Sequence, residues 1–472
     1  MKKLLALLMA VLVMTGCFWS AVKPVSAASQ LPNIQAEAYI LIDMTTGEIL
    51  TEKNPEETLY PASTTKMMTA ILAIENLDLN ASWTADPEVY ATGGSRLTLI
   101  NGEECKIRDV LYATMVKSAN DGAVFLGKAT AGTTEAFLEM MNNKAAELGC
   151  VNTHFANPNG LHLENHYSCA GDLAKIALYC MKNETFRDIV KTPSYTMPAT
   201  NLSSERTVQN TNLLLYDCTE SNKVSVNGQL RYCKYDGILG IKTGYTPEAQ
   251  GCLVSAAERD GTSLLCVVLK STTMGRFSDS IALLDWGFEN FRTERVMESG
   301  RDMGTANVRK GAVKTVGLIS DDTIDMTLPA EASSNLIQIE TDIPDPVPSP
   351  VTKGQQLGTY TIYEGGLEVG TYPLLAVADV AEGGILSVFG IEDEIAHKIF
   401  LITGLTLGGI LFLGFAFVMI MHYRAVQRRK KKAAAKAARL AAKRAAEEAQ
   451  RRDWMNRFDS RYQITENDED GR

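Results

Sequence analysis

The sequence has no CxxC pair and no group of cysteines and histidines at metal-ligand spacing, so a zinc site is not expected. It has only five histidines, and their arrangement does not support a catalytic triad built on histidine. The apolar fraction of 45% and the charged fraction of 22% are ordinary for globular proteins, which excludes disordered, collagen-like and disulfide-knot chains. At roughly 150 residues per domain, the 472 residues predict about three units.

Basic residues are scarce in the long central part of the chain. Residues 28–398 contain 28 Lys and Arg but 48 Asp and Glu, whereas residues 422–472 contain 15 basic and 8 acidic groups. The formal net charge of −10 is thus an average over segments of opposite sign. The acidic balance argues against nucleic acid as a partner.

Residues 1–27 have the pattern of a secretory signal peptide. Lys2 and Lys3 precede an apolar run, and small residues at 25–27 form the expected cleavage site after Ala27. Met14–Cys17 resembles a weak lipobox, and a buried N-terminal helix is the other alternative, although Pro24 fits it poorly.

Residues 399–421 are an uncharged apolar run long enough to cross a bilayer, at roughly 34 Å of helix. The basic residues that follow predict a cytoplasmic tail over 422–472, with the acidic part of the chain outside the cell. Residues 433–452 should be helical. This helix either lies against anionic headgroups or is a solvated helix that only fixes the topology.

Eight cysteines remain after removal of the signal peptide. Cys218 and Cys233 flank an expected loop and could form a disulfide, but the sequence leaves the pairing open. Cys180, Cys252 and Cys266 lie in apolar runs and are more typical of small core residues.

Between residues 33 and 292 the hydrophobic pattern switches between strand and helix periods, which predicts a mixed α/β domain. Helices are expected over 63–76, 107–130, 135–148 and 278–291, and strands over 38–54 (a hairpin), 237–244, 250–258 and 264–271, with Asp260-Gly261 as a tight turn. Short β-rich runs over 296–386 predict a small all-β sandwich, which acts as a spacer or docking module.

Three short motifs carry candidate chemistry: Ser63-x-x-Lys66, Ser118-x-Asn120 and Lys242-Thr243-Gly244. A serine hydroxyl is a weak nucleophile that needs a base, and a lysine one helical turn later lies on the same face. Lys66 can be that base only if burial or a second cation, here Lys242, keeps part of it neutral. Singly the motifs mean little, since Ser63 could also be an ordinary helix N-cap.

In combination they resemble the low-molecular-mass penicillin-binding proteins, the serine-type D-alanyl-D-alanine carboxypeptidases of the penicillin-binding protein 5 type. The resemblance rests on Tyr60–Thr69, Met115–Asp121, Thr153–His162, Gly240–Thr246 and Leu283–Phe288. It implies a β-lactamase/transpeptidase-like α/β (α+β) domain over 33–292 and a β-sandwich over 296–386. No cofactor or metal is implied.

The resemblance also implies a role for each residue. Ser63 would form the acyl-enzyme on a peptidoglycan stem peptide, Lys66 would be the base, and Ser118 and Asn120 would line the cleft. Lys242, Thr243, Gly244, Tyr245 and Arg276 would bind the substrate, with the N–H groups of Ser63 and Tyr245 as the oxyanion hole. β-Lactams would be covalent inhibitors. Arg276 could equally be an exposed arginine at a helix start, and His154, His162 and His166 would be structural.

Two features depart from the family pattern. Tyr245 stands where several relatives have histidine, and a full transmembrane span replaces the amphipathic helix of many relatives. A β-lactamase is the alternative enzyme, but Glu164-Asn165 lacks the E-x-x-x-N spacing of class A members. A non-catalytic sensor of cell-wall peptides or β-lactams, signalling through the basic tail, is the alternative of another class.

Overall fold

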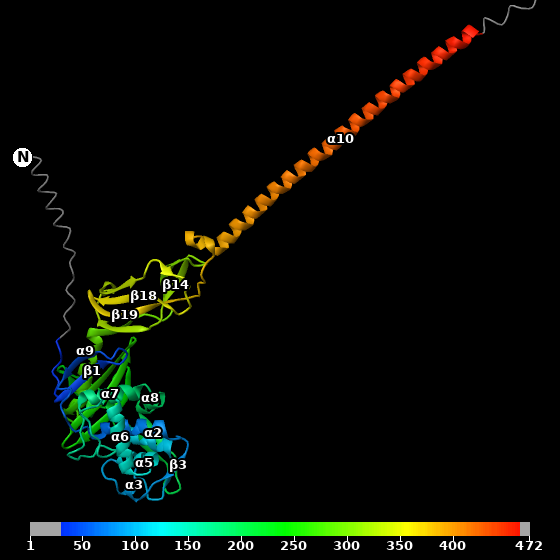
Figure 1. Cartoon of the computed structure of the whole chain (residues 1–472). Helices are drawn as coiled ribbons and strands as arrows, with labels where there is room; N and C mark the ends of the chain where they lie inside the picture. Colours follow the sequence, from blue (N-terminus) through cyan, green and yellow to red (C-terminus); the bar gives the residue numbers. More distant parts are fainter. Residues whose placement is uncertain (1–29, 463–472) are drawn as a thin grey trace, which may run out of the picture. The chain divides into compact units, whose positions relative to one another are not determined.

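The computed structural model describes residues 30–462, so the expected signal peptide lies outside the described residues (Figure 1). The described residues form two compact units. The first comprises residues 30–301, 320–342 and 359–373, and the second comprises residues 302–319, 343–358 and 374–462.

A five-stranded antiparallel sheet forms the centre of the first unit, in the order β2-β1-β11-β10-β9. Its strands are β1 (Ala38–Asp43), β2 (Ile49–Lys53), β9 (Ile238–Thr246), β10 (Gln250–Arg259) and β11 (Thr262–Ser271). The predicted hairpins are confirmed, and Asp260 and Gly261 both have positive φ (48° and 84°), as a tight turn requires. The Lys-Thr-Gly motif lies on β9, at one edge of this sheet.

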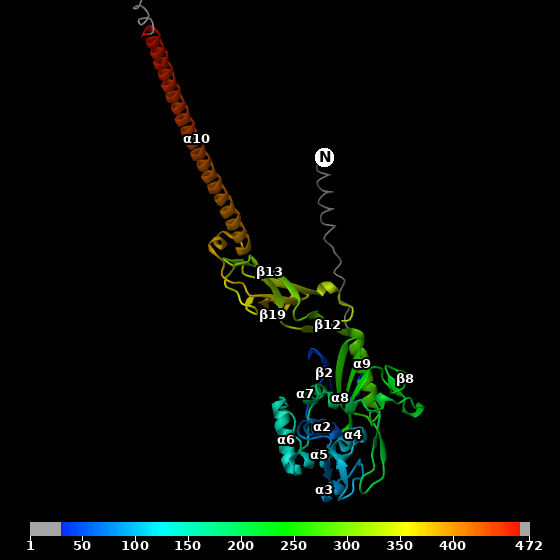
Figure 2. The same cartoon turned by 90° about the vertical axis from the view of Figure 1, so that its right-hand side faces the viewer.

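Both faces of the sheet are buried, which explains why its strands read as nearly continuous apolar runs. Along β1, Ile40 packs into one hydrophobic core and Leu41 into the other. Helix α9 (Gly275–Asn290) covers the Leu41 face and contributes Phe277 to its core. Helices α2, α4, α5 and α7 supply the core on the opposite face, where they gather as a separate layer (Figures 1 and 2).

The helices of this layer are α2 (Lys66–Asn76), α3 (Pro87–Ala91), α4 (Ile107–Lys117), α5 (Asn120–Ala131), α6 (Thr134–Glu147), α7 (Ala170–Met181) and α8 (Glu184–Val190). The single helix expected over 107–130 is wrong, because the chain breaks between α4 and α5. Ser118 adopts a left-handed conformation with φ 61°, and the Ala119 N–H bonds back to the Thr114 carbonyl. This break turns the Ser-x-Asn motif into a helix junction.

Short strands and 3-10 helices complete residues 30–290: η1 (Ala62–Thr65), β3 (Ser82–Thr84), β4 (Glu104–Lys106), β5 (Ser194–Met197), β6 (Arg206–Gln209), η2 (Leu213–Leu215), η3 (Glu220–Asn222), β7 (Val224–Val226) and β8 (Gln229–Arg231).

From Phe291 to Ala376 the regular elements are strands, apart from the 3-10 turn η4 (Ser334–Leu336), so the all-β character is confirmed. They are β12 (Phe291–Met297), β13 (Asp302–Arg309), β14 (Thr315–Ser320), β15 (Ile324–Pro329), β16 (Ile337–Asp342), β17 (Val347–Pro348), β18 (Gln356–Glu364) and β19 (Leu367–Ala376). In the first unit β12 pairs with β15 and β16 with β18; in the second β13 pairs with β14 and β17.

After the 3-10 helix η5 (Ile385–Phe389), the chain forms one continuous helix, α10 (Asp393–Tyr462). It contains the predicted apolar run and is long and apolar enough to cross a membrane. The stretch 433–452 is helical, as expected, because it continues α10 without a break. The structure pairs none of the eight cysteines of the described residues: Cys218 is an exposed thiol, and Cys233 is buried.

Candidate active site

The turn that carries Ser63 lies directly before α2 and packs against the sheet strands β9 and β10. Ala62 to Thr65 form the 3-10 helix η1, and α2 begins directly afterwards at Lys66, so Ser63 and Lys66 project from one continuous turn. Gly160 packs against this turn with φ 83°, and a Cβ atom there would come within 1.8 Å of the Ala62 carbonyl oxygen. Only glycine fits this contact.

Lys66 is fully buried, and its ammonium nitrogen has three polar neighbours. Nζ lies 2.8 Å from Ser63 Oγ, 2.8 Å from Asn120 Oδ1 and 2.5 Å from the Asn159 carbonyl oxygen. Burial is the largest cause that lowers the pKa of Lys66 well below its usual value, and the charge of Lys242 lowers it further. Asp121 opposes this shift. The buried amine is therefore biased toward its neutral form.

In the neutral form of Lys66, these three contacts determine where the lone pair points. The Asn120 and Asn159 oxygens are carbonyls and can only accept hydrogen bonds. A neutral amine has two N–H groups and one lone pair, so the two carbonyls occupy both N–H groups. The lone pair then points at Ser63 Oγ, the one neighbour that can donate a proton.

The Lys-Thr-Gly strand lies against the serine turn. A Cβ atom on Gly244 would come within 2.9 Å of the Pro61 carbonyl oxygen, so the close approach of β9 requires glycine. Lys242 is buried, and burial followed by the charge of Arg276 lowers its pKa to about 7. Its ammonium donates to the Thr243 carbonyl at 3.1 Å, and within residues 30–462 its other N–H groups have no hydrogen-bond acceptor.

Arg276 is partly buried, so the alternative of an exposed arginine at a helix start is wrong. Its guanidinium donates to the Gly244 carbonyl at 2.7 Å, which ties the start of α9 to the edge strand. Its Nε is buried and has no hydrogen-bond partner among the described residues. Together with Lys242, it leaves unsatisfied cationic donors beside the serine turn, a feature suited to binding a carboxylate.

Asn120 and Ser118 come from the junction between α4 and α5. Asn120 Nδ2 donates to the Gly93 carbonyl at 2.8 Å, so its Oδ1 is turned toward Lys66. The Ser118 hydroxyl has no hydrogen-bond partner within residues 30–462. Asp121, which follows Asn120, accepts hydrogen bonds from the backbone N–H groups of Leu97 and Leu99 and holds the loop around these residues in place.

The sequence analysis used Thr153–His162 only as part of the family resemblance and missed that the Asn159 carbonyl in this loop contacts Lys66. Asn157 Oδ1 accepts from the Gly160 N–H at 2.7 Å, and its Nδ2 donates to the Leu161 carbonyl at 2.8 Å. Thr69 Oγ1 donates to the Pro158 carbonyl at 2.6 Å and ties the loop to α2. The Asn-Pro-Asn-Gly sequence was the available signal, since such residues form tight turns, but no sequence pattern indicates where a carbonyl points.

His166 connects this region to the serine turn as a structural residue. Its Nδ1 accepts from the Ala156 N–H at 3.0 Å, so the neutral ring carries its proton on Nε2, which lies 2.8 Å from Thr65 Oγ1. Burial is the main cause that lowers the pKa of His166 to about 4. The ring therefore stays neutral at physiological pH.

The structure brings together most of the predicted residues. Hydrogen bonds link Ser63, Lys66 and Asn120 directly, and Gly244 packs against Pro61 and Ala62 of the serine turn. Thr243 Oγ1 lies 2.6 Å from Thr211 Oγ1. Tyr245 follows on β9 with 53% of its surface exposed.

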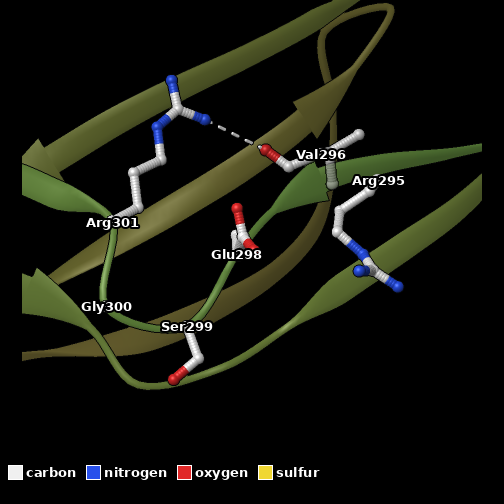
Figure 3. A pocket seen from close by; sticks show the side chains of 6 residues that line it. All are labelled: Arg295, Val296, Glu298, Ser299, Gly300 and Arg301. Atoms are coloured by element: carbon white, nitrogen blue, oxygen red, sulfur yellow. Dashed lines mark hydrogen bonds between the residues drawn. The ribbon is translucent and has the colours of Figure 1, made fainter.

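A hollow of about 530 Å³ lies elsewhere in the first unit, between β12 and the turn that follows it (Figure 3). It is lined by Arg295, Val296, Glu298, Ser299, Gly300 and Arg301. The Arg301 guanidinium donates to the Val296 carbonyl, while Arg295 points away and pairs with Asp325. None of the three motifs contributes to this hollow, so it is not the candidate site.

Comparison with known proteins identifies the family. Residues 25–273 match the family model described as D-alanyl-D-alanine carboxypeptidase, which covers more than half of the chain. The chain belongs to this family. Residues 291–382 match the model of the penicillin-binding protein 5 C-terminal domain. The predicted family, fold class and serine carboxypeptidase class are therefore confirmed.

Relatives of this carboxypeptidase match over most of their length. The D-alanyl-D-alanine carboxypeptidase DacF of Bacillus subtilis is 30% identical over 359 residues, which cover 75% of this chain and 88% of the relative. The enzyme of Streptomyces sp. strain K15 is 36% identical over 282 residues, 56% of this chain and 91% of the relative. The structure of penicillin-binding protein 5 from Haemophilus influenzae superposes with a TM-score of 0.61 at 27% identity, covering 75% of this chain and 99% of the other.

Proposed function

We propose that Ser63 is the nucleophile that removes the terminal D-alanine from peptidoglycan stem peptides. Its Oγ attacks the penultimate D-alanine carbonyl while Lys66 takes the hydroxyl proton. The bond to the leaving D-alanine breaks, an ester forms on Ser63, and water then hydrolyses this ester. The 2.8 Å contact of Lys66 Nζ with Ser63 Oγ, beside the Asn120 and Asn159 carbonyl oxygens, is the observation that carries the proposal.

The remaining predicted residues complete the reaction. Ser118, whose hydroxyl is unpaired in the described residues, relays a proton to the leaving amine, and Asn120 also bonds the substrate amide. The backbone N–H groups of Ser63 and Tyr245 stabilise the oxyanion. Lys242 and Arg276 bind the terminal carboxylate, a role supported by their unsatisfied buried donors. Thr243 and Gly244 align the peptide along β9.

A β-lactam mimics the same peptide and would acylate Ser63. Class A β-lactamases activate the hydrolytic water with the glutamate of an E-x-x-x-N segment, acting through a bound water, and Glu164-Asn165 does not have this spacing. The site therefore supports a long-lived β-lactam adduct rather than rapid β-lactam turnover.

The apolar run of α10 and the basic residues that follow it support a membrane topology. We infer that residues 399–421 cross the membrane, that the basic tail 422–472 is cytoplasmic, and that the carboxypeptidase domain (33–292) and the β domain (296–386) face the wall.

The full chain in detergent is expected to release D-alanine from a pentapeptide ending in D-Ala-D-Ala and to keep a fluorescent penicillin through gel electrophoresis. D-Alanine release is measured by a coupled amino-acid oxidase assay. Turnover of a chromogenic cephalosporin at rates comparable to D-alanine release would instead favour the β-lactamase alternative, and absence of labelling would reject acylation.

Asn157 provides a test of how Lys66 is oriented. Asn157→Ala is expected to lower kcat about tenfold, because the Asn159 carbonyl loses its support, while KM changes less than about twofold. Asn157→Asp keeps the acceptor for Gly160 and should recover part of kcat. Steady-state kinetics on the pentapeptide measure both constants, with Asn143→Ala, on the exposed side of α6, as the control. An Asn157→Ala variant with a raised KM and an unchanged kcat would contradict the orienting role of Asn157.

A further inference from the structure

The 3-10 helix η5 presents large apolar side chains to the surroundings, directly before α10. Ile385, Val388 and Phe389 are exposed by 85%, 61% and 77%. These three side chains, all within five consecutive residues, are called the apolar patch here. Clusters of exposed apolar side chains on a soluble protein often contact a partner or a membrane.

The patch is held in place by backbone contacts. The Gly383 N–H bonds to the Lys310 carbonyl, and Ser387, the buried residue of η5, donates its hydroxyl to the Gly384 carbonyl at 2.6 Å. A Cβ atom on Gly383 would come within 2.5 Å of Ser387 Cβ, so this face is closely packed. The apolar side chains of η5 therefore point outward from a fixed segment.

Further hydrogen bonds connect η5 to the first turn of α10. The Gly384 N–H donates to Asp393 Oδ1 at 2.8 Å, and the Ile391 N–H bonds back to the Leu386 carbonyl. Gly390, with φ 70°, reverses the chain between the two helices. Figure 1 shows η5 as the short orange helix at the foot of α10. The patch therefore lies at the level where α10 begins.

With residues 399–421 in the bilayer, this level would be close to the membrane surface. The apolar run of α10 starts at Ile399, six residues after Asp393, which corresponds to about 9 Å of helix. The headgroup layer on one side of a bilayer is roughly 5–8 Å thick. Ile395, exposed by 44%, extends the apolar surface of α10 toward η5. A small tilt of α10 would bring the patch into the headgroup region.

We propose that Ile385, Val388 and Phe389 insert into the interface of the leaflet through which α10 enters, as a second membrane contact beside the transmembrane helix. The inference rests on the proposed membrane span of α10. Lipid is favoured over a protein partner because the patch directly precedes α10, whose apolar run begins only about 9 Å of helix beyond Asp393. Two contacts would restrict the rotation and tilt of η5 and α10, which a single helix leaves free.

The experiment uses the full chain, with one tryptophan added, in phosphatidylcholine vesicles that contain lipid carrying a nitroxide near the headgroup. Phe389→Trp and Val388→Trp test the patch. Leu367→Trp is the matched control, because Leu367 on β19 is also 77% exposed. Subtracting the fluorescence of the unsubstituted chain isolates each added tryptophan, and fluorescent-penicillin labelling verifies that each variant is folded.

At least threefold stronger quenching by the nitroxide lipid is expected for Phe389→Trp and Val388→Trp than for Leu367→Trp, with the reverse order for quenching by aqueous iodide. Quenching of both patch variants at the level of the control, in protein that floats with the vesicles, would overturn the proposal and leave the membrane span intact. Failure of the unsubstituted chain to float with the vesicles would overturn both.

Discussion

Replacing Ser63 with alanine is expected to lower kcat for D-alanine release by at least about 10⁴-fold and to abolish covalent labelling by penicillin. The alanine side chain has no oxygen with which to form the ester. Ser118 cannot substitute for it, because Lys66 contacts Ser63 rather than Ser118. D-Alanine release and gel fluorescence measure the two effects.

The control for this experiment is Ser194→Ala, at an exposed serine on β5. It should retain both activities, and the thermal unfolding midpoint of Ser63→Ala should stay close to that of the unsubstituted chain. If Ser63→Ala kept its penicillin label, the acyl-enzyme would have to lie on another residue.

Replacing Lys66 with arginine is expected to lower the acylation rate by about 10²–10⁴-fold, the range of a lost general base. Arginine keeps the positive charge but is not deprotonated at physiological pH. Lys66→Gln, which removes the charge, should lose a similar factor. Stopped-flow measurement of acylation by a β-lactam gives the rate of this step directly. A much milder loss for arginine than for glutamine would mean that Lys66 acts as a cation rather than as a base.

The pH dependence gives a second readout of the same residue. Only neutral Lys66 can accept the proton, so acylation by the unsubstituted chain should fall as pH drops through the Lys66 pKa. That pKa is held well below its usual value, first by burial and then by Lys242. The falling limb should therefore lie far below the pH at which an exposed lysine titrates.

The sequence predicted the elements of the first unit well because its sheet strands are buried on both faces and its helices have regular apolar spacing. The three motifs predicted Ser63, Lys66 and Lys242 as site residues because the proposed reaction depends on side-chain types. The Ser-x-Asn motif was expected at a helix–loop junction, but the helical pattern over 107–130 runs through it, since Ser118 adopts positive φ without a glycine or proline to mark the break.

The contribution of Asn159 could not be predicted for a different reason. Its backbone carbonyl, not its side chain, contacts Lys66, and any residue type carries such a carbonyl. Its position depends on the Asn157 side chain and on the fit of Gly160 against Ala62, which arise only in the folded chain. Likewise, no pattern in the sequence marks the apolar residues of η5 as exposed, which only the structure shows.

The central claim is that Ser63 carries the acyl group, and peptide mapping by mass spectrometry tests it most directly. The full chain is incubated with benzylpenicillin, digested and sequenced by fragmentation. One equivalent of the intact penicilloyl group is predicted on the peptide that contains Ser63, with the fragment ions assigning it to that residue. An adduct on Ser118 or on any other residue, or no adduct at all, would contradict the account.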